Sequence, residues 1–310
     1  MNTKPVRLAL VGLGKIARDQ HLPAIRDDPR FELVATTDPV SDDTDGTPHF
    51  ATFQDMLAHC DGIDAVAICT PPQARHDIAR AAIAAGLAVL LEKPPCATVS
   101  EAEALVALAA TKGTTLFAAW HSRYAATVSL ARDWLASCTI LDTAIIWRED
   151  VRVWHPGQPW IWQAGGFGVF DPGINALSIA TSILPGPLRV LGGTLAVPAN
   201  CGAPVSGEIS MADGNGASLS VDLDFLQTGP QTWDIRVNTD AGGLLISQGG
   251  AQLHLPNETI LRQDHEYPAI YARFAELIAS GESDADIAPL RLVADAFMRC
   301  RITAAPDFVE

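Results

Sequence analysis

Two glycines near the N-terminus stand where a strand-like segment passes into a helix-like one. Gly12 and Gly14 belong to the pattern G-x-G-x-x-A, which follows the apolar run Val6–Val11 and precedes the helix-like segment Lys15–Arg26. Glycines here let the main chain approach a pyrophosphate closely, and the helix N-terminus supplies N–H donors and positive potential. The pattern therefore predicts a dinucleotide-phosphate site. The alternative is an ordinary strand-to-helix turn.

An acidic residue follows the second strand-like run, Phe31–Thr37. The Asp38 carboxylate can accept hydrogen bonds from ribose hydroxyls, and it repels a 2′-phosphate. No Arg or Lys lies between Phe31 and Arg75, so nothing nearby attracts that phosphate. We therefore predict NAD in preference to NADP, with dual use left open. The alternative is a solvated loop aspartate.

The composition narrows the classes of partner. The 310 residues are 48% apolar and 18% charged, which is enough apolar material for about two folded domains. Lys and Arg number 21 against 36 Asp and Glu, for a net charge of −15. A field of that sign repels nucleic-acid backbones and anionic lipid, so neither is an expected partner.

Strand-like and helix-like segments alternate through the first third of the chain, which predicts a doubly wound parallel sheet. The five expected strands are Val6–Val11, Phe31–Thr37, Ala65–Cys69, Ala88–Leu91 and Leu116–Ala119. The last helix before the fifth strand is expected at Ser100–Lys112, with Ser100 as N-cap and Glu103 as its capping-box partner.

From Tyr124 onward the strand-like segments are no longer separated by helices, which predicts an open, mainly antiparallel sheet. Further helices are expected at 267–279 and 289–300. The prediction is an α/β Rossmann domain over residues 1–122 and an α+β domain over residues 123–310. In this division the C-terminal helix can also pack against the first domain.

The six cysteines form no CxxC and no zinc-like spacing with histidine, so no metal site is expected. The N-terminus runs straight into a strand-like segment without a signal-peptide pattern, and no uninterrupted apolar stretch is long enough to span a bilayer. These features predict a reduced, cytoplasmic protein.

Four motifs carry a family resemblance: GLGKIA, CTPPQARH at 69–76, EKP at 92–94 and GGFGVFDPGIN at 165–175. In order and spacing they resemble the Gfo/Idh/MocA oxidoreductases over nearly the whole chain. WHPGQPWIW and GVFDPGINALSI are most similar to bacterial 1-dehydrogenases of L-arabinose and D-galactose. The resemblance implies NAD(P)-dependent oxidation of an aldopyranose to the aldonolactone, and a homodimer formed through the open sheet. Alternatives are an oxidoreductase acting on another sugar or polyol, and a non-catalytic, NAD-sensing regulator.

Three residues are the expected catalytic groups. Lys93 ends a strand at the edge where parallel sheets bind ligands, and there it can move a proton next to a nicotinamide. Asp171 and Asn175 are four residues apart and share one helix face. Asp171 is expected to orient the C1 hydroxyl or act as base, and the alternative is a helix N-cap before Pro172. The family usually has His at the position of Asn175, so any acid–base role of that residue moves elsewhere.

A tryptophan-rich segment is the expected sugar site, because indole rings match the apolar faces of sugars. Trp147, Trp154, Trp160 and Trp162 fall within it, and for any single one a core position is the alternative. The substrate ligands that we expect are Glu149, Trp154, His155, His121, Lys93, Asp171 and Asn175. For His121 a structural hydrogen bond is the alternative.

The cofactor is expected to lie on the loops that follow the strands of the first domain. The expected contacts are Gly12, Gly14, Lys15, Ile16, Asp38, Cys69, Thr70, Pro71, His76, Glu92, Lys93 and His121. A structural role is the alternative for His76. Enzymes of the arabinose type have Ser-Arg in place of Asp38-Pro39, so their preference for NADP is not expected here.

Overall fold

The computed structural model describes residues 4–40 and 46–309. The chain forms two compact units. Unit 1 comprises Met1–Ala119 and Tyr267–Ile287, and unit 2 comprises Trp120–Glu266 and Ala288–Glu310. The domain boundary expected from the sequence, after residue 122, would assign Tyr267–Ile287 to the second domain. In the structure this segment belongs to unit 1.

Unit 1 is built on a six-stranded sheet in the order β3-β2-β1-β4-β5-β6, and every strand pair in it is parallel. The strands are β1 (Val6–Val11), β2 (Phe31–Thr37), β3 (His49–Phe50), β4 (Ala65–Ile68), β5 (Ala88–Glu92) and β6 (Leu116–Ala119). The predicted doubly wound parallel sheet is confirmed. The short edge strand β3 was not predicted.

The helices of unit 1 follow the predicted alternation, with two local differences. They are η1 (Ala17–His21), α1 (Leu22–Asp27), α2 (Phe53–His59), α3 (Pro72–Ala84), α4 (Val99–Lys112) and α8 (Glu266–Ser280), which begins one residue before the unit boundary. The segment expected as one helix from Lys15 is helical from that residue, but it contains the π-helical turn η1. Helix α4 begins earlier than expected, so Thr98 and Glu101 form its capping box and the prediction of Ser100 with Glu103 was wrong.

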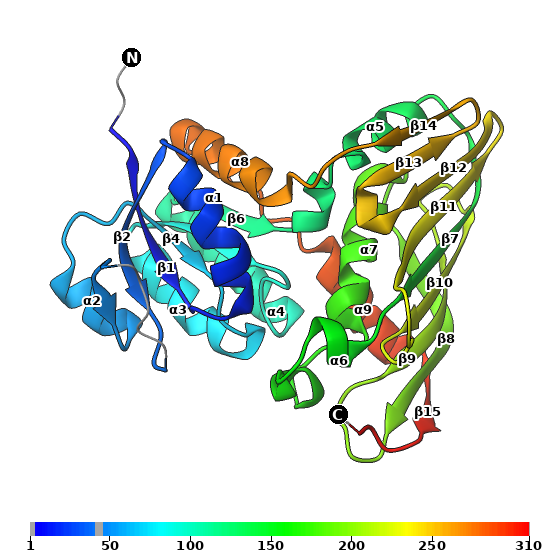
Figure 1. Ribbon diagram of the computed structural model, residues 1–310, viewed down its shortest axis with the longest axis horizontal. Coiled ribbons are helices and arrows are strands. Elements are labelled where there is room, and N and C mark those ends of the chain that lie inside the picture. The colour runs from blue at the N-terminus through cyan, green and yellow to red at the C-terminus, as the bar shows by residue number, and fades with distance from the viewer. Residues whose placement is uncertain (1–3, 41–45, 310) are drawn as a thin grey trace. The chain divides into compact units, whose positions relative to one another are not determined.

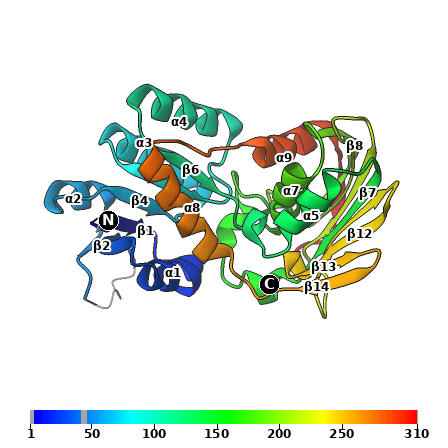
Figure 2. The same cartoon turned by 90° about the horizontal axis from the view of Figure 1, so that it is seen from above.

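Helix α8 joins unit 1 although it comes late in the chain. The Phe274 ring lies 6.1 Å from that of Phe31 in β2 and 6.2 Å from that of Phe117 in β6. Both views show α8 beside α1 (Figures 1 and 2). The aromatic side chains of α8 therefore belong to the core of unit 1.

Unit 2 contains a nine-stranded sheet in the order β14-β13-β12-β11-β7-β10-β9-β8-β15. The strands are β7 (Ile140–Arg148), β8 (Arg189–Pro198), β9 (Ser206–Ala212), β10 (Ser218–Asp224), β11 (Thr232–Thr239), β12 (Gly242–Ser247), β13 (Gln252–Leu255), β14 (Glu258–Leu261) and β15 (Arg301–Ala305). Only β7 with β10 and β8 with β15 pair in parallel, so the mainly antiparallel sheet is confirmed. Strands β13 to β15 were not predicted.

The longer helices of unit 2 cover one face of its sheet, as Figure 1 shows. They are α5 (Val128–Leu135), α7 (Phe170–Ile183) and α9 (Ala288–Arg299), and the shorter ones are η2 (His121–Tyr124), α6 (Val151–Trp154), η3 (Pro159–Trp162) and η4 (Gln248–Gly250). In the described part of the chain, no helix lies on the opposite face. No helix within residues 4–40 and 46–309 is long and apolar enough to cross a membrane.

Candidate functional site

The glycine loop after β1 lies against the main chain that follows β4. A side chain on Gly12 would put its Cβ 2.8 Å from the Thr70 nitrogen, and the φ of Gly12 is +91°, which favours glycine. A Cβ on Gly14 would meet nothing within 4 Å. A side chain at position 12 would therefore clash with the main chain that follows β4, whereas the space beside Gly14 is open. Lys15 and Ile16 are exposed, and Lys15 pairs with Asp19.

Asp38 holds the glycine loop directly. Its Oδ2 accepts the Leu13 N–H at 2.8 Å, and its Oδ1 accepts the Val40 N–H at 2.9 Å. The carboxylate is half-buried and bonded, in contrast to a solvated loop aspartate. A carboxylate held by two main-chain N–H groups therefore lies beside the glycine loop.

A buried polar atom near the glycine loop fits a bound dinucleotide. Thr70 Oγ1 is buried and has no hydrogen-bond partner among the described residues, which is costly unless a ligand or water supplies one. Cys69 beside it is buried, and Pro71 is the exposed residue before α3. His76 in the first turns of α3 has Nδ1 3.1 Å from Asp77 Oδ1.

The Glu92 side chain stands at the centre of a buried cluster. Glu92 Oε1 accepts the Tyr267 hydroxyl at 2.7 Å and lies 3.0 Å from His21 Nε2. The other ring nitrogen of His21 lies 2.8 Å from the Tyr271 hydroxyl. Burial disfavours the charged imidazole, but Cys69 and Glu92 outweigh it and raise the pKa of His21 to about 10. Glu92, which we expected to contact the cofactor, therefore forms a buried ion pair with His21.

Lys93 is fixed through its main chain. Its N–H donates to Glu92 Oε2 at 2.8 Å, and its peptide bond to Pro94 is cis. The side chain is half-buried at the carboxyl end of β5, as expected for a residue of the ligand-binding edge.

In unit 2, three predicted residues form one cluster. His155 Nε2 lies 3.2 Å from Glu149 Oε1, and His155 Nδ1 lies 3.4 Å from Asp171 Oδ2. Both carboxylates are almost fully buried, whereas 19% of the His155 side chain is exposed. We call Glu149, His155 and Asp171 the acid–imidazole cluster. Two buried acids with a histidine between them can accept, hold and pass a proton.

Asp171 belongs to this cluster and does not cap a helix. Helix α7 begins at Phe170, and its N-cap position is Val169, without a side-chain cap. Asp171 therefore lies inside the first turn, and the N-cap interpretation was wrong. Pro172 is tolerated there because the first turn has no intrahelical partner for its missing N–H.

The tryptophan environment of the cluster comes partly from a strand far along the chain. Trp233 in β11 donates from Nε1 to Glu149 Oε2 at 2.7 Å, and its ring centroid lies 4.8 Å from that of Trp154. Trp233 pairs directly with Trp147 across β11 and β7, and their rings stack at 5.9 Å. Trp233 was not among the predicted site residues, because only the strand pairing brings it to Glu149.

A cavity of about 270 Å³ lies in unit 2 and contains Asn175 and Glu149 in its wall. The other lining residues are His121, Ser122, Ala125, Ala126, Trp147, Trp233, Gln248, Gly249, Ala251, Asp264 and Glu266. Trp147 Nε1 is buried here without a hydrogen-bond partner among the described residues. Aromatic faces with amide, carboxylate and indole N–H groups suit a small polyhydroxylated ligand.

His121 lines the same cavity and has a strong partner. Its Nδ1 lies 2.5 Å from Glu266 Oε2, and both side chains are largely buried. Arg123, two residues on, donates to the Ser178 carbonyl and to Thr181 Oγ1 and so ties η2 to α7. Glu266 is a second functional candidate that the sequence pattern did not single out.

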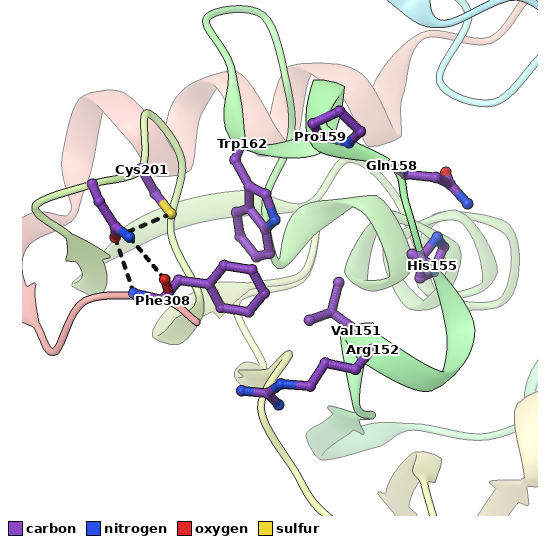
Figure 3. A pocket seen from close by; sticks show the side chains of 9 residues that line it. Val151, Arg152, His155, Gln158, Pro159, Trp162, Cys201 and Phe308 are labelled. Carbon is purple, nitrogen blue, oxygen red and sulfur yellow. Dashed lines mark hydrogen bonds between the residues drawn. The ribbon is translucent and has the colours of Figure 1, made fainter. Parts of the chain in front are cut away.

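A second cavity of about 250 Å³, with His155 in its wall, is shown in Figure 3. The Trp162 and Phe308 rings in its wall lie 4.7 Å apart, and Asn200 bonds both main-chain groups of Phe308. Since Glu149 lines one cavity and His155 the other, their contact lies between the two. Among the residues that the structure describes, no group of His, Cys, Asp and Glu has a metal-binding arrangement.

Known proteins are similar to this chain in sequence over both units. The family model described as an oxidoreductase family with an NAD-binding Rossmann fold, Gfo/Idh/MocA, matches residues 6–120. Galactose 1-dehydrogenase of Pseudomonas fluorescens is 43% identical over 312 aligned positions, which cover 95% of each chain.

Solved structures extend the similarity to the whole fold. D-galactose-1-dehydrogenase from Rhizobium etli superposes with a TM-score of 0.96 at 49% identity, covering 100% of this chain and 99% of that one. KijD10, a 3-ketoreductase from Actinomadura kijaniata crystallised with NADP and TDP-benzene, superposes with a TM-score of 0.85. It is 21% identical over 97% of this chain and 100% of its own, and at that identity it supports the fold alone.

Proposed function

We propose that this chain, which belongs to the Gfo/Idh/MocA family of NAD-binding oxidoreductases, oxidises an aldopyranose at C1 to the aldonolactone. The observation that carries the proposal is the acid–imidazole cluster, whose Glu149 lines a cavity of about 270 Å³ together with the stacked rings of Trp147 and Trp233. The two galactose 1-dehydrogenases that it resembles support the same substrate class.

The side chains of unit 2 would hold the sugar. Trp233 and Trp154 offer apolar ring faces to its C–H groups, while Glu149, His155 and Asn175 bond its hydroxyls. Glu149 is already fixed by Trp233 Nε1, so its carboxylate is held in place before a ligand arrives. His121, held by Glu266, is the further hydroxyl ligand that we assign.

Unit 1 would hold the NAD, since the NAD-binding family model matches residues 6–120, and a bound nicotinamide would supply the hydride acceptor for C1. Gly12, Gly14, Thr70 and Asp38 would hold the dinucleotide, since they provide the open loop, the unpaired hydroxyl and the fixed acid. The chain itself must take the C1 hydroxyl proton. Lys93 and Asp171 are the two candidates for this acceptor.

We further propose that NAD is preferred to NADP. The Asp38 carboxylate is pinned by two main-chain N–H groups, so it cannot swing away from an incoming 2′-phosphate. Its charge would repel that phosphate, whereas ribose hydroxyls can donate to it.

L-arabinose and D-galactose are the substrates that we propose, because these sugars share ring configuration and differ only at C5. Unit 1 would then form the cofactor domain and unit 2 the sugar domain. The helix-free face of the unit 2 sheet, where Ile146 is exposed, is the proposed homodimer surface. All six cysteines are free thiols, which supports a reducing, cytoplasmic setting.

Initial rates with a panel of aldoses and polyols, each with NAD and with NADP, test these proposals together. We expect turnover with D-galactose and L-arabinose and faster rates with NAD. Turnover confined to another sugar or to a polyol would replace the substrate assignment. NAD binding without turnover of any member would favour the non-catalytic regulator.

A further inference from the structure

A buried arginine lies beneath the carboxyl edge of the unit 1 sheet. Arg75 is in the first turns of α3, and only 2% of its surface is exposed. Burying a guanidinium is costly unless its N–H groups find acceptors. The acceptors that it has therefore indicate what it does.

Those acceptors are main-chain carbonyls of two neighbouring loops. Arg75 Nη1 donates to the carbonyls of Glu92 and Pro94, and Nη2 donates to the carbonyl of Thr70. Glu92 and Pro94 are the residues on either side of Lys93. A single planar group thus bonds the chain before and after the lysine.

The side chain of Glu92 completes this arrangement. Its Oε2 accepts the Lys93 N–H, and its Oε1 is held by Tyr267 and His21. The main chain at Lys93 is therefore bonded from one side by Arg75 and from the other by the buried Glu92 cluster. Few degrees of freedom remain at this point except those of the lysine side chain itself.

We propose that Arg75 is a positioning residue for the reaction, which fixes the main chain around Lys93 so that the lysine amine has a defined place. The proposal rests on the role of Lys93 in the proposed function. Lysine at position 75 would keep the charge, but it cannot bond three carbonyls in one plane. The planar fork of Arg75, and not its charge alone, is the feature that matters.

The test compares Arg75→Lys with Arg80→Lys, which is the matched control because Arg80 lies on the same helix with 62% of its side chain exposed. We expect Arg75→Lys to lower kcat by about 10- to 100-fold, because misplacement of a reacting group by about 1 Å has effects of that size. The Kd for NAD should change far less, and Arg80→Lys should behave as wild type. A loss seen only in NAD affinity would overturn the proposal.

A double-mutant cycle separates positioning from general damage. In a Lys93→Ala background, Arg75→Lys should have no further effect on kcat, because the residue that it positions is gone. An equal loss in both backgrounds would show that Arg75 does not act through Lys93 and would overturn the proposal. Arg75→Ala supplies a second variant, whose kcat should recover partly with guanidinium well below unfolding concentrations and not with ammonium.

A readout without turnover keeps this inference distinct from the substrate assignment. Labelling of Lys93 by an amine-reactive reagent, measured by peptide mass mapping, should quicken in Arg75→Lys, while the exposed Lys112 serves as internal reference. If no aldose is oxidised but labelling quickens, the proposed function fails and the positioning role stands. Labelling equal to wild type would overturn the positioning role whatever the enzyme oxidises.

Discussion

Lys93 in unit 1 and Asp171 in unit 2 are the two candidate proton acceptors, and their surroundings differ. Lys93 follows a strand, and bonds to its own N–H and to the adjoining carbonyls fix its main chain. Asp171 lies within a helix, and its carboxylate contacts the His155 side chain. The same imidazole also contacts Glu149. One region is positioned by backbone contacts and the other by side chains that depend on one another. Removing Arg75 should therefore displace Lys93 through the main chain, whereas removing His155 should leave both acids of the cluster without their shared partner.

Replacing either candidate proton acceptor should give the largest effect. Lys93→Ala should lower kcat by about 10²- to 10⁴-fold, the range of general acid–base catalysis, with NAD binding retained. Asp171→Asn should also weaken sugar binding, since His155 loses a partner. Steady-state kinetics measure kcat and the KM for the sugar, and calorimetric titration measures the Kd for NAD. Lys112→Ala is the control. A Lys93→Ala enzyme at full speed would refute the role of the lysine.

The His21–Glu92 pair predicts a pH dependence of stability. The pKa of His21 is raised from its ordinary 6.5 to about 10, so its contribution is complete below pH 6.5 and declines as the pH rises toward 10. The free energy of unfolding should fall by up to about 1.4 kcal/mol per pH unit through this contribution. Burial also raises the pKa of Cys96, to about 12, and that of Tyr271, which steepens the fall at higher pH.

Denaturant unfolding from about pH 6.5 to about pH 8 measures the His21 slope before the unfolded Cys96 thiol, with an ordinary pKa of about 8.5–9, begins to ionise. His21→Gln should be less stable and should lose the slope. His59→Gln, which removes an exposed histidine whose Nδ1 bonds the Asp55 carbonyl in its own helix, should keep the slope. The same slope in both variants would assign the dependence to another group.

The Asp38 loop tests whether a backbone-held charge selects the cofactor. Asp38→Asn keeps an acceptor for the Leu13 N–H, and combining it with Pro39→Arg adds a cation for the 2′-phosphate. The ratio of kcat/KM for NAD over NADP should fall by about 100-fold, equivalent to about 2.7 kcal/mol. Asp38→Asn alone is the control for charge removal. An unchanged ratio in the double variant would contradict the electrostatic argument.

Trp233 tests the side-chain network of unit 2. Trp233→Phe keeps the ring but removes the N–H that Glu149 Oε2 accepts, so the carboxylate loses a fixed partner. We expect the KM for galactose to rise by about 10-fold, because hydrogen bonds to charged groups contribute about 1.5–3 kcal/mol. Trp134→Phe in α5 is the control, since Trp134 does not line this cavity. An unchanged KM would remove Trp233 from the sugar site.

The same contrast explains how much could be read from the sequence. The loops of unit 1 follow directly from strand ends, so Gly12, Asp38 and Lys93 could be assigned along the chain. The spacing of Asp171 and Asn175 was also readable, although it allowed an N-cap as well. Trp233 and Glu266 could not be found, because their partners Glu149 and His121 are far away in sequence and depend on the folded topology.

The N-cap of α4 gives the smallest expected effect. It distinguishes two sequence patterns that both fit a capping box. Both Thr98 with Glu101 and Ser100 with Glu103 fit the capping box, but only Thr98 accepts the N–H three residues on while Glu101 bonds back. Thr98→Ala should therefore cost about 1 kcal/mol of unfolding free energy. Ser100→Ala should cost less, since Ser100 is a first-turn residue. Denaturant melts of the two variants decide between them, and an equal loss would mean that the first turn can shift to use either cap.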